Sequence, residues 1–348
     1  MSGANPQPGT ALDAPLLEIR DVWKEFPLVS GLLEQLKFER GRLVRKRESV
    51  KALNGVSLDI RQGEALCVVG ESGCGKSTLA RVVMGLLEPT SGEIRFEGQR
   101  IDNLSTGRML PFRRRMQMIF QNPYASLNPR MTVRQTLEEP VRFHHPSFSG
   151  DDVRTQVAEV MKSVGVDPSW AERFPHEFSG GQRQRISIAR ALTMNPEFIV
   201  ADEPISALDV SIQAQVLNLL MDAQQQRGLT YLFITHDLSV VEHFGSRVAV
   251  MYLGTLCELA ETRRLFASPR HPYTQALLSA IPRLDRKDSG HIRLKGEVPT
   301  PINLPTGCVF HKRCPHAKQR CEQEIPSPLP VDEGTLVACH GIEEGWIE

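Results

Sequence analysis

A glycine-rich run that ends in lysine and serine is the part of this sequence best suited to chemistry. The run consists of Gly70, Glu71, Ser72, Gly73, Cys74, Gly75, Lys76 and Ser77, followed by Thr78, and it fits G-x-x-x-x-G-K-[ST]. In this pattern glycines let backbone N–H groups approach phosphate oxygens, the lysine neutralises the β- and γ-phosphates, and the last hydroxyl ligates Mg²⁺. The loop needs a strand before it and a helix after it, which residues 65–69 and 77–84 supply. The sequence therefore predicts a nucleotide site here.

Two acidic residues follow an apolar stretch at 198–201 that predicts a buried strand. Asp202, at the end of this strand, is placed to hold Mg²⁺ directly or through water. Glu203 is then the candidate general base, because a carboxylate that chelates the metal cannot also deprotonate the attacking water. With the glycine-rich loop, this pair predicts hydrolysis of a nucleoside triphosphate.

A second turn has the features of an anion site. It consists of Ser179, Gly180, Gly181 and Gln182, and a long helical segment follows it. Free backbone N–H groups and the helix dipole favour an anion there, although the turn contains no lysine. One chain thus offers two half-sites for a single triphosphate, and the simplest geometric solution is a head-to-tail pair of subunits. An ordinary turn would explain the same residues equally well.

The overall composition narrows the class of protein. Lys plus Arg and Asp plus Glu are equal at 41 each, which removes the electrostatic argument for nucleic acid as the main partner. No run of 18 or more uncharged apolar residues occurs, and residues 1–15 have the composition of a disordered leader, not of a secretion signal. Seven cysteines without an export signal fit a reducing cytosol. We expect neither a membrane span nor secretion.

The order of the predicted elements indicates an α/β fold. Strands are expected at 16–26, 57–60, 92–96, 116–120, 198–201 and 230–234, and helical stretches at 132–164 and 211–226. Their alternation in the second half predicts a parallel sheet with helices on both faces. The segment between the first two strands is basic, and we expect a solvated loop, with contact to anionic lipid as the alternative. Its basic residues are Lys37, Arg40, Arg42, Arg45, Lys46 and Arg47.

Taken in order, the motifs of residues 16–268 resemble those of ATP-binding cassette (ABC) ATPases. The order runs from the glycine-rich loop through Gln121, residues 178–182, the acidic pair and residues 206–209 to His236. The resemblance implies ATP and Mg²⁺ as ligands. It also implies a P-loop NTPase (RecA-like) core with an antiparallel β-subdomain and a helical subdomain at about residues 125–190.

The resemblance further assigns roles to single residues. Gln121 corresponds to the glutamine that senses Mg²⁺ and the attacking water, so the expected Mg²⁺ ligands are Ser77, Gln121 and Asp202. His236 corresponds to the histidine that contacts the γ-phosphate, and Asp209 to the loop that crosses to the partner subunit.

An aromatic residue for the adenine is expected near the start of the cassette. Phe26 occupies the place where the family stacks an aromatic ring on the base. Trp23 is a rival for this role, and packing of Phe26 in the core is a further alternative.

Two stretches narrow the resemblance to the ATPase subunits of oligopeptide and dipeptide importers. They are residues 202–215 and His271-Pro272-Tyr273-Thr274, which opens a C-terminal extension. This implies a second ATPase subunit, expected to be a paralogue, two membrane permeases and an extracytoplasmic solute-binding protein, at the cytoplasmic face of the plasma membrane and without nucleic acid. Importers of nickel, opines or oligosaccharides, exporters, and non-transport ABC ATPases acting on nucleic acid or ribosomes remain alternatives.

The extension, residues 269–348, has too few apolar residues to build much core. It contains Cys308, Cys314, Cys321 and Cys339 in the spacing C-x₅-C-x₆-C-x₁₇-C. Thiolate clusters bind zinc or iron–sulfur clusters, and the importer resemblance implies a [4Fe–4S] cluster. Zinc and unligated thiols are alternatives, because spacing alone does not choose the metal. Substitute ligands are His311, His316 and His340, whereas core or loop packing is expected for Cys67, Cys74 and Cys257.

Overall fold

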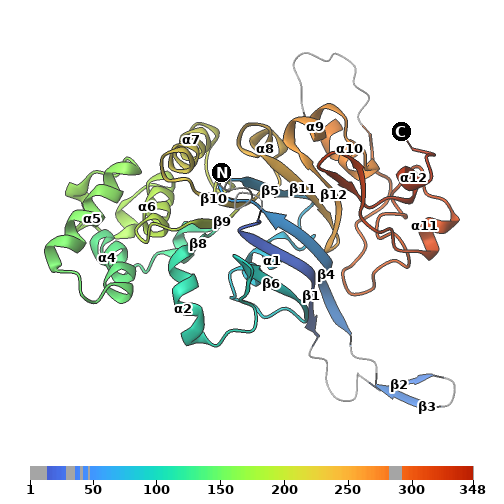
Figure 1. Cartoon of the computed structure of the whole chain (residues 1–348), viewed down its shortest axis with the longest axis horizontal. Coiled ribbons are helices and arrows are strands. Elements are labelled where there is room, and N and C mark those ends of the chain that lie inside the picture. Colours follow the sequence, from blue (N-terminus) through green and yellow to red (C-terminus); the bar gives the residue numbers. More distant parts are fainter. Residues whose placement is uncertain (1–13, 29–35, 40–41, 46–47, 282–291, 348) are drawn as a thin grey trace, which may run out of the picture.

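The computed structural model describes residues 14–28, 36–39, 42–45, 48–281 and 292–347. These residues form an eight-stranded sheet, a four-stranded sheet, a small hairpin and the helices that surround them (Figure 1). The predicted leader falls outside this description except for its last two residues, and so do Arg40, Lys46 and Arg47 of the basic insertion. The described part of the insertion forms a hairpin of β2 (Leu36–Glu39) and β3 (Arg42–Arg45), not the loop that we predicted.

The larger sheet has the strand order β13-β14-β12-β11-β5-β10-β9-β8. Its parallel part, as the strand–helix alternation predicted, consists of β5 (Ala65–Val69), β8 (Met116–Ile119), β9 (Phe198–Asp202), β10 (Thr230–Ile234) and β11 (Arg247–Tyr252). Its antiparallel edge consists of β12 (Thr255–Glu261), β13 (Leu329–Asp332) and β14 (Thr335–Val337). Because parallel strands end at one edge of the sheet, the segments after β5, β9 and β10 come together there.

Strands β5, β9 and β10 in the middle of this sheet are buried on both faces, which explains why they are nearly continuous apolar runs. In β5, Leu66 and Val68 belong to the core on one face, and Ala65, Cys67 and Val69 belong to the core on the other. Successive side chains of a strand point to opposite faces, so a strand with both faces buried needs an apolar residue at every position.

The smaller sheet has only antiparallel neighbours, in the order β4-β1-β6-β7. Its strands are β1 (Leu17–Pro27), β4 (Ser49–Ile60), β6 (Ser91–Phe96) and β7 (Gln99–Arg100). The strand predicted at 57–60 is the end of the longer β4, in which Ser49 pairs with Pro27 and Ile60 with Leu17. Helix α1 (Lys76–Val83) contributes Leu79 to a core shared by both sheets.

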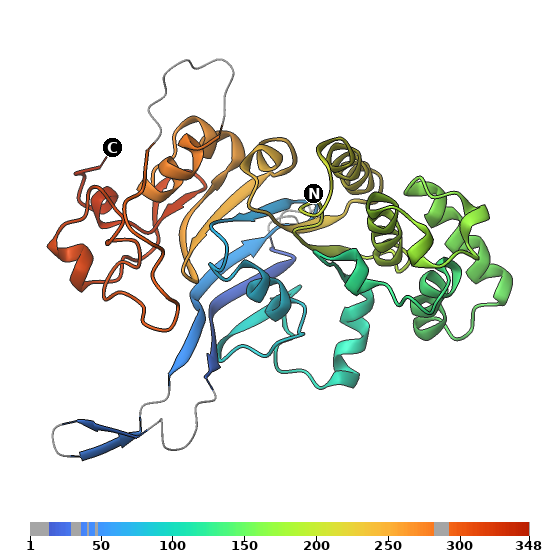
Figure 2. The same ribbon diagram turned by 180° about the vertical axis from the view of Figure 1, so that it is seen from behind.

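Three helices pack together at one end of the molecule, as Figures 1 and 2 show: α4 (Val133–His144), α5 (Gly150–Ser163) and α6 (Gly180–Leu192). Each begins with a capping box, in which a Ser or Thr side chain and the third residue of the helix satisfy each other's backbone N–H groups. The capping residues are Thr132, Ser149 and Ser179. The helical stretch predicted at 132–164 is therefore two helices, because Pro146 disfavours helix at the residue before it and Ser149 starts a new helix.

The remaining helices connect the strands or cover the sheet. They are α2 (Thr106–Arg115), which we did not predict, α3 (Pro123–Ser126), α7 (Val210–Arg227), α8 (Leu238–Phe244), α9 (Thr262–Ala267), α10 (Pro272–Ser279), α11 (Gln319–Gln323), α12 (His340–Glu343) and the 3₁₀ turns Pro168–Trp170 and Pro175–Glu177. Among the residues described, no helix is long and apolar enough to cross a bilayer.

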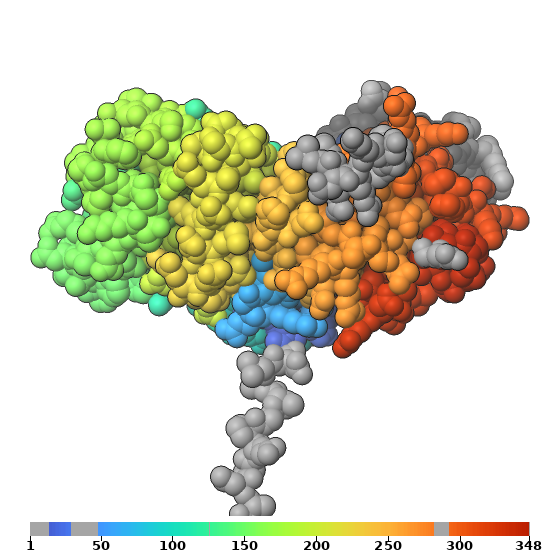
Figure 3. All heavy atoms as spheres, turned by 90° about the horizontal axis from the view of Figure 1, so that it is seen from above, coloured from blue at the N-terminus to red at the C-terminus, as the bar shows by residue number. Residues whose placement is uncertain are grey.

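The C-terminal part of the chain continues the larger sheet. Strand β14 pairs with β12, with Glu258 opposite Val337, and β13 adds a further strand. Figure 3 shows the two ends of the molecule as separate lobes, with α4 to α7 (green to yellow) in one and the C-terminal residues (orange to red) in the other. The four-cysteine segment therefore lies against the sheet that carries the glycine-rich loop.

Candidate nucleotide site

The glycine-rich loop has a backbone that only glycine accepts at its two ends. Gly70 has φ of +152° and Gly75 has φ of +103°. A Cβ atom at Gly70 would lie 2.2 Å from the carbonyl oxygen of Met251, and a Cβ atom at Gly75 would lie 2.3 Å from that of Ala52. The close approach of neighbouring backbone therefore requires these glycines, and they leave the loop N–H groups free of side-chain cover.

Lys76 lies inside the curve of this loop. Its Nζ atom donates hydrogen bonds to the carbonyl oxygens of Gly70, at 2.7 Å, and Glu71, at 3.1 Å. The side chain is 5% exposed, so its cation is held at the centre of the loop by neutral carbonyl groups. A phosphate group offers this ammonium a charged partner in place of the carbonyls.

The candidate Mg²⁺ ligands from two motifs are in contact. The Ser77 hydroxyl donates a hydrogen bond of 2.8 Å to Oδ1 of Asp202. Burial raises the pKa of Asp202, and the hydrogen bond from Ser77 opposes this shift. A buried carboxylate beside a hydroxyl is a set of hard oxygen donors, so these two residues fit a Mg²⁺ ion that keeps several waters and phosphate oxygens as its other ligands.

Two further predicted residues, Gln121 and His236, converge on one carboxylate oxygen of the predicted base Glu203. Oε2 of Glu203 accepts a hydrogen bond of 3.0 Å from Nε2 of Gln121 and lies 3.4 Å from Nδ1 of His236. Glu203 has φ of +47°, an uncommon conformation for a residue with a side chain, and its N–H donates to the carbonyl of Ile234. A strained backbone held in this way is typical of functional sites.

Most of these groups line one pocket of about 500 Å³, whereas Asp202 lies behind Ser77 and is not part of the lining. Its lining consists of Phe26, Val50, Ala52, Ser72, Gly73, Gly75, Lys76, Ser77, Thr78, Gln121, Glu203, His236 and Pro301. Three residues of the predicted loop, Gly70, Glu71 and Cys74, do not line it. The Cys74 side chain is buried, and burial raises the pKa of its thiol, so it behaves as a packing residue.

The structure separates the two candidates for stacking on a base. Phe26 lines the pocket, and the Lys24 ammonium lies 5.1 Å from its ring centroid. The indole N–H of Trp23 donates to Asp21, and its side chain lines a different cavity. The geometry therefore favours Phe26.

The second predicted anion turn lies elsewhere. None of the residues Ser179 to Gln182 lines the pocket of the same chain, and neither does Asp209. The turn instead adjoins the start of α7: a Cβ atom at Gly181 would lie 2.5 Å from Cγ2 of Ile212, and Asp209 accepts a hydrogen bond of 3.1 Å from the backbone N–H of Ile212. The turn and Asp209 thus belong to one surface that is not part of this pocket.

Sequence reasoning missed the contribution of the C-terminal part to this region. Pro301 lines the pocket, and its carbonyl accepts a hydrogen bond of 2.9 Å from the backbone N–H of Lys51. Arg313 and Tyr273 contact Glu71 of the loop. Tyr273 belongs to the stretch that opens the C-terminal extension, but nothing in that stretch or around Arg313 and Pro301 indicated a contact with the loop, since such contacts depend on how distant segments pack.

The four cysteines of the C-terminal part are neighbours but do not form a ligand set. Burial is the main reason that the pKa values of Cys308 and Cys314 rise to about 12 and about 11, and nearby cysteines raise them further. Each of the six pairs among Cys308, Cys314, Cys321 and Cys339 contributes to such a shift, so all four thiols share one neighbourhood. Within the described ranges, however, no three His, Cys, Asp or Glu side chains are placed to hold a metal ion.

Two of the three predicted substitute ligands, His311 and His340, are engaged elsewhere. Both ring nitrogens of His340 have partners, Glu343 and the carbonyl of Glu324, and Nδ1 of His311 is 2.8 Å from the carbonyl of Cys308. The donor chemistry of the four thiols fits a thiophilic metal, whereas their arrangement does not support the predicted [4Fe–4S] cluster or its zinc alternative.

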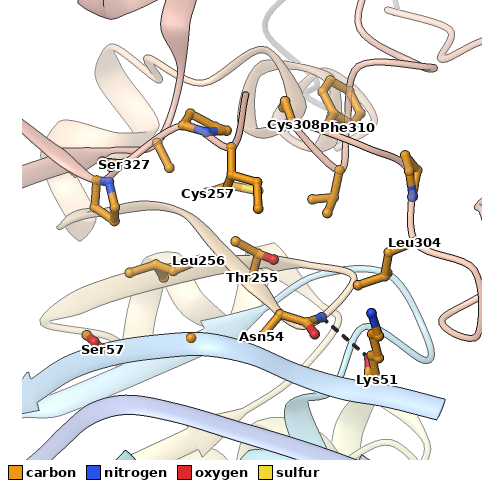
Figure 4. Close-up of a pocket in the computed structure, with 18 of the residues that line it drawn as sticks. Lys51, Asn54, Ser57, Thr255, Leu256, Cys257, Leu304, Cys308, Phe310 and Ser327 are labelled. Carbon is orange, nitrogen blue, oxygen red and sulfur yellow. Dashed lines mark hydrogen bonds between the residues drawn. The ribbon is translucent and has the colours of Figure 1, made fainter. Parts of the chain in front are cut away.

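A second cavity of about 500 Å³ lies between strands β4 and β12 and the C-terminal part (Figure 4). Lys51 and Asn54 face it from β4, Cys257 from β12, and Cys308 and Phe310 from the C-terminal part. It contains the rival aromatic residue Trp23 and none of the predicted phosphate-binding residues. It is therefore distinct from the nucleotide pocket.

The fold and the pocket define a class of protein. A parallel sheet with a glycine-rich loop after β5, a carboxylate pair at the end of β9 and a histidine after β10 is the arrangement of a P-loop NTPase. The family model described as ABC transporter matches residues 53–206, and the one described as oligopeptide/dipeptide transporter, C-terminal region, matches residues 257–321.

Similar proteins agree with these matches. The chain is 52% identical to the oligopeptide transport ATP-binding protein AppF of Bacillus subtilis (strain 168), over 93% of this chain and 97% of that protein. It is 48% identical to the dipeptide transport ATP-binding protein DppF of Escherichia coli (strain K12), over 96% of both. A solved dimeric ATP-binding cassette in a post-hydrolysis state with ADP and Pi superposes with a TM-score of 0.61 at 30% identity, covering 71% of this chain and 99% of that one. The chain belongs to the ABC transporter family, among the ATPase subunits of the oligopeptide/dipeptide type.

Proposed function

We propose that this chain hydrolyses ATP as a subunit of an importer for dipeptides or oligopeptides. The observation that carries the proposal is the 52% identity to an oligopeptide transport ATP-binding protein over 93% of the chain. In this proposal residues 16–268 are the ATPase domain, with a helical subdomain at about 125–190, and residues 269–348 are the C-terminal extension with its cysteine cluster.

ATP binding is assigned to the pocket around the glycine-rich loop. Lys76 exchanges its two carbonyl partners for phosphate oxygens, and the ring of Phe26 stacks on the adenine. Ser77, Asp202 and Gln121 are the residues that would hold Mg²⁺, which would neutralise charge on the triphosphate. The contact between Ser77 and Asp202 supports this assignment, because both already face one another.

Hydrolysis is assigned to Glu203 as general base. Its Oε2 atom accepts the proton of a water that attacks the γ-phosphate, while Gln121 orients the carboxylate through their hydrogen bond. His236, whose Nδ1 lies 3.4 Å from the same oxygen, is assigned to contact the γ-phosphate. The three side chains come from the segments after β8, β9 and β10, so the sheet edge holds them in register.

A complete site needs two subunits in this proposal. Ser179 to Gln182 and Asp209 lie together outside the pocket of their own chain, which leaves them available to the nucleotide of a head-to-tail partner. ATP then binds the closed pair more tightly than the open one, and hydrolysis reopens it. The partner is a paralogous ATPase, and the pair lies at the cytoplasmic face of the membrane beneath two permeases that receive solute from an extracytoplasmic binding protein.

Transport by the whole assembly tests the solute class. The chain is reconstituted in proteoliposomes with its partner ATPase, permeases and binding protein, and uptake of a radiolabelled dipeptide and a pentapeptide is measured with ATP inside. ATP-dependent peptide uptake that is absent with Glu203→Gln supports the proposal. Uptake of nickel, an opine or an oligosaccharide, with no peptide uptake, would replace peptides as the solute, and ATP turnover that responds to DNA or ribosomes but not to permeases would refute the importer.

The four cysteines are not arranged as a ligand set among the described residues, and in this proposal their thiols move together to hold a [4Fe–4S] cluster, with zinc as the alternative. The shared neighbourhood of the thiols supports this part of the proposal, and a bound metal would supply positive charge that stabilises their thiolates. Iron, acid-labile sulfide and zinc are measured on anaerobically purified protein and on the Cys321→Ser variant. Folded wild-type protein without any of the three would refute metal binding.

A further inference from the structure

Glu71 belongs to the glycine-rich loop, yet its side chain points towards the C-terminal part of the chain. Nη1 of Arg313 donates a hydrogen bond of 2.7 Å to its Oε2, and Nη2 donates one of 3.1 Å to its Oε1. This two-pronged ion pair is largely out of solvent, since the Arg313 side chain is 9% exposed and that of Glu71 is 28% exposed. Such pairs fix geometry as well as charge.

The backbone of Glu71 is held from the same side. Its N–H donates a hydrogen bond of 2.9 Å to the hydroxyl of Tyr273, from α10. The ring of Tyr273 packs against those of Tyr252 and Phe310, with distances between ring centroids of 4.8 and 5.3 Å. Arg313 also donates to the Tyr252 hydroxyl at 3.4 Å. Both the side chain and the main chain of one loop residue are therefore held by a packed aromatic cluster.

The charge of Arg313 is secure in this setting. Burial by itself would lower the pKa of its guanidinium, but the hydrogen bonds to Glu71 and Tyr252 raise that pKa above its usual value. The cation offsets the negative charge of Glu71 in a loop built to receive phosphate groups. Without it, an unpaired carboxylate would stand in the loop that binds the triphosphate.

Arg313 is itself set in a rigid turn. Its N–H and that of Cys314 both donate to the carbonyl of Phe310, at 2.9 and 3.0 Å. Cys308 and Phe310 of the same segment face the second cavity (Figure 4). The segment whose Arg313 contacts the glycine-rich loop thus also contains Cys308 and Cys314, two of the four clustered cysteines.

We propose that Arg313 is a positioning residue for the ATPase reaction, which holds the glycine-rich loop through Glu71 in the shape that receives the triphosphate. The C-terminal part is then a working component of the nucleotide site and not only an attachment to it. The contact at Pro301, which lines the same pocket, agrees with this inference.

The experiment measures steady-state ATPase kinetics and MgATP affinity of the full-length protein in its transporter complex, for Arg313→Gln, Glu71→Gln and the double variant. We expect each single substitution to raise KM for ATP about tenfold, which equals about 1.4 kcal/mol of lost binding, with kcat changed much less. The KM of the double variant should not exceed the higher of the two single-variant values, because both substitutions break the same ion pair. Arg313→Lys, which keeps the charge without the two-pronged geometry, should give an intermediate KM.

Arg320→Gln is the matched control, because the ion pairs of Arg320 in the described part of the chain are with Glu324, Glu343 and Glu344 of the C-terminal part and not with the loop. Its KM should equal that of the wild type. The proposal is overturned if folded Arg313→Gln and Glu71→Gln keep KM within twofold of wild type, or if Glu71→Gln binds ATP more tightly than wild type. It is also overturned if the rise in KM of the double variant equals the product of the rises in the two single variants. Should Arg313→Gln fail to fold, Arg313→Lys and Glu71→Gln still decide between these results.

Discussion

Replacing Glu203 with glutamine removes the candidate base and retains its size and one of its hydrogen bonds. The amide oxygen of the new side chain can accept the same bond from Gln121 that Oε2 of Glu203 accepts at 3.0 Å. The amide cannot accept a proton from water, so the chemical step loses its base while the pocket keeps its shape. Lys76 and Ser77 donate their hydrogen bonds to Gly70, Glu71 and Asp202, which the substitution does not change, and the binding of ATP should therefore remain.

The size of the effect follows from the role of the lost group. General base catalysis contributes about 10²- to 10⁴-fold, which corresponds to about 2.7 to 5.4 kcal/mol of activation free energy. A substitution that leaves the surrounding contacts in place changes binding by about 0.5 kcal/mol or less. We therefore expect turnover to fall at least about a hundredfold while the dissociation constant of MgATP changes less than about threefold.

Phosphate release, equilibrium binding of MgATP and size-exclusion chromatography measure the three consequences together. The Glu203→Gln protein should bind ATP, fail to release phosphate and accumulate as a closed pair. Asp202→Asn is the contrasting variant, because it removes the carboxylate that Ser77 contacts and should weaken MgATP binding as well as turnover. If Glu203→Gln retains more than about a tenth of wild-type turnover, the base is another group and the assigned chemistry is wrong.

Three other substitutions test separate parts of the structure. Gly75→Ala adds a Cβ atom 2.3 Å from the Ala52 carbonyl at φ of +103°, so MgATP binding should fall more than about tenfold, measured by equilibrium titration. Gly181→Ala places a Cβ atom 2.5 Å from Ile212 Cγ2, and it should lower turnover of the pair about tenfold or more while single-chain ATP binding is kept; unchanged turnover would contradict the head-to-tail site. Burial lowers the pKa of His271 from 6.5 to about 4, so the unfolded chain takes up a proton there more readily than the folded one. The contribution of His271 to the free energy of unfolding is therefore fully present above pH 6.5 and falls by roughly 3 kcal/mol as the pH falls towards 4. Denaturant unfolding of His271→Asn, which keeps a capping side chain for α10, should show a flatter decline over this range.

The local motifs could be predicted from the sequence because one short segment contains all the residues that each motif requires. The glycine-rich loop needs glycines at fixed offsets, a lysine, a hydroxyl, and a strand and helix beside it, and the structure has all of these at residues 65–84. The parallel order of strands was also predictable, because apolar runs separated by helical segments have few ways to pair. The ends of a strand were not predictable where pairing with another strand sets them. Strand β4 begins at Ser49, opposite Pro27, and nothing local to residues 49–56 required a strand.

The sequence by itself identified the candidate residues for phosphate and Mg²⁺, because the chemistry that they offer is a property of their types and spacing. Only the tertiary structure decided that Phe26 and not Trp23 lines the pocket, and that the four thiols gather without forming a ligand set. It also decided that the side chain of Glu71 pairs with Arg313, which lies 242 positions further along the chain. The physical reason is that such contacts depend on how folded segments pack, and neither partner of a distant pair alters the local pattern from which the other would be read.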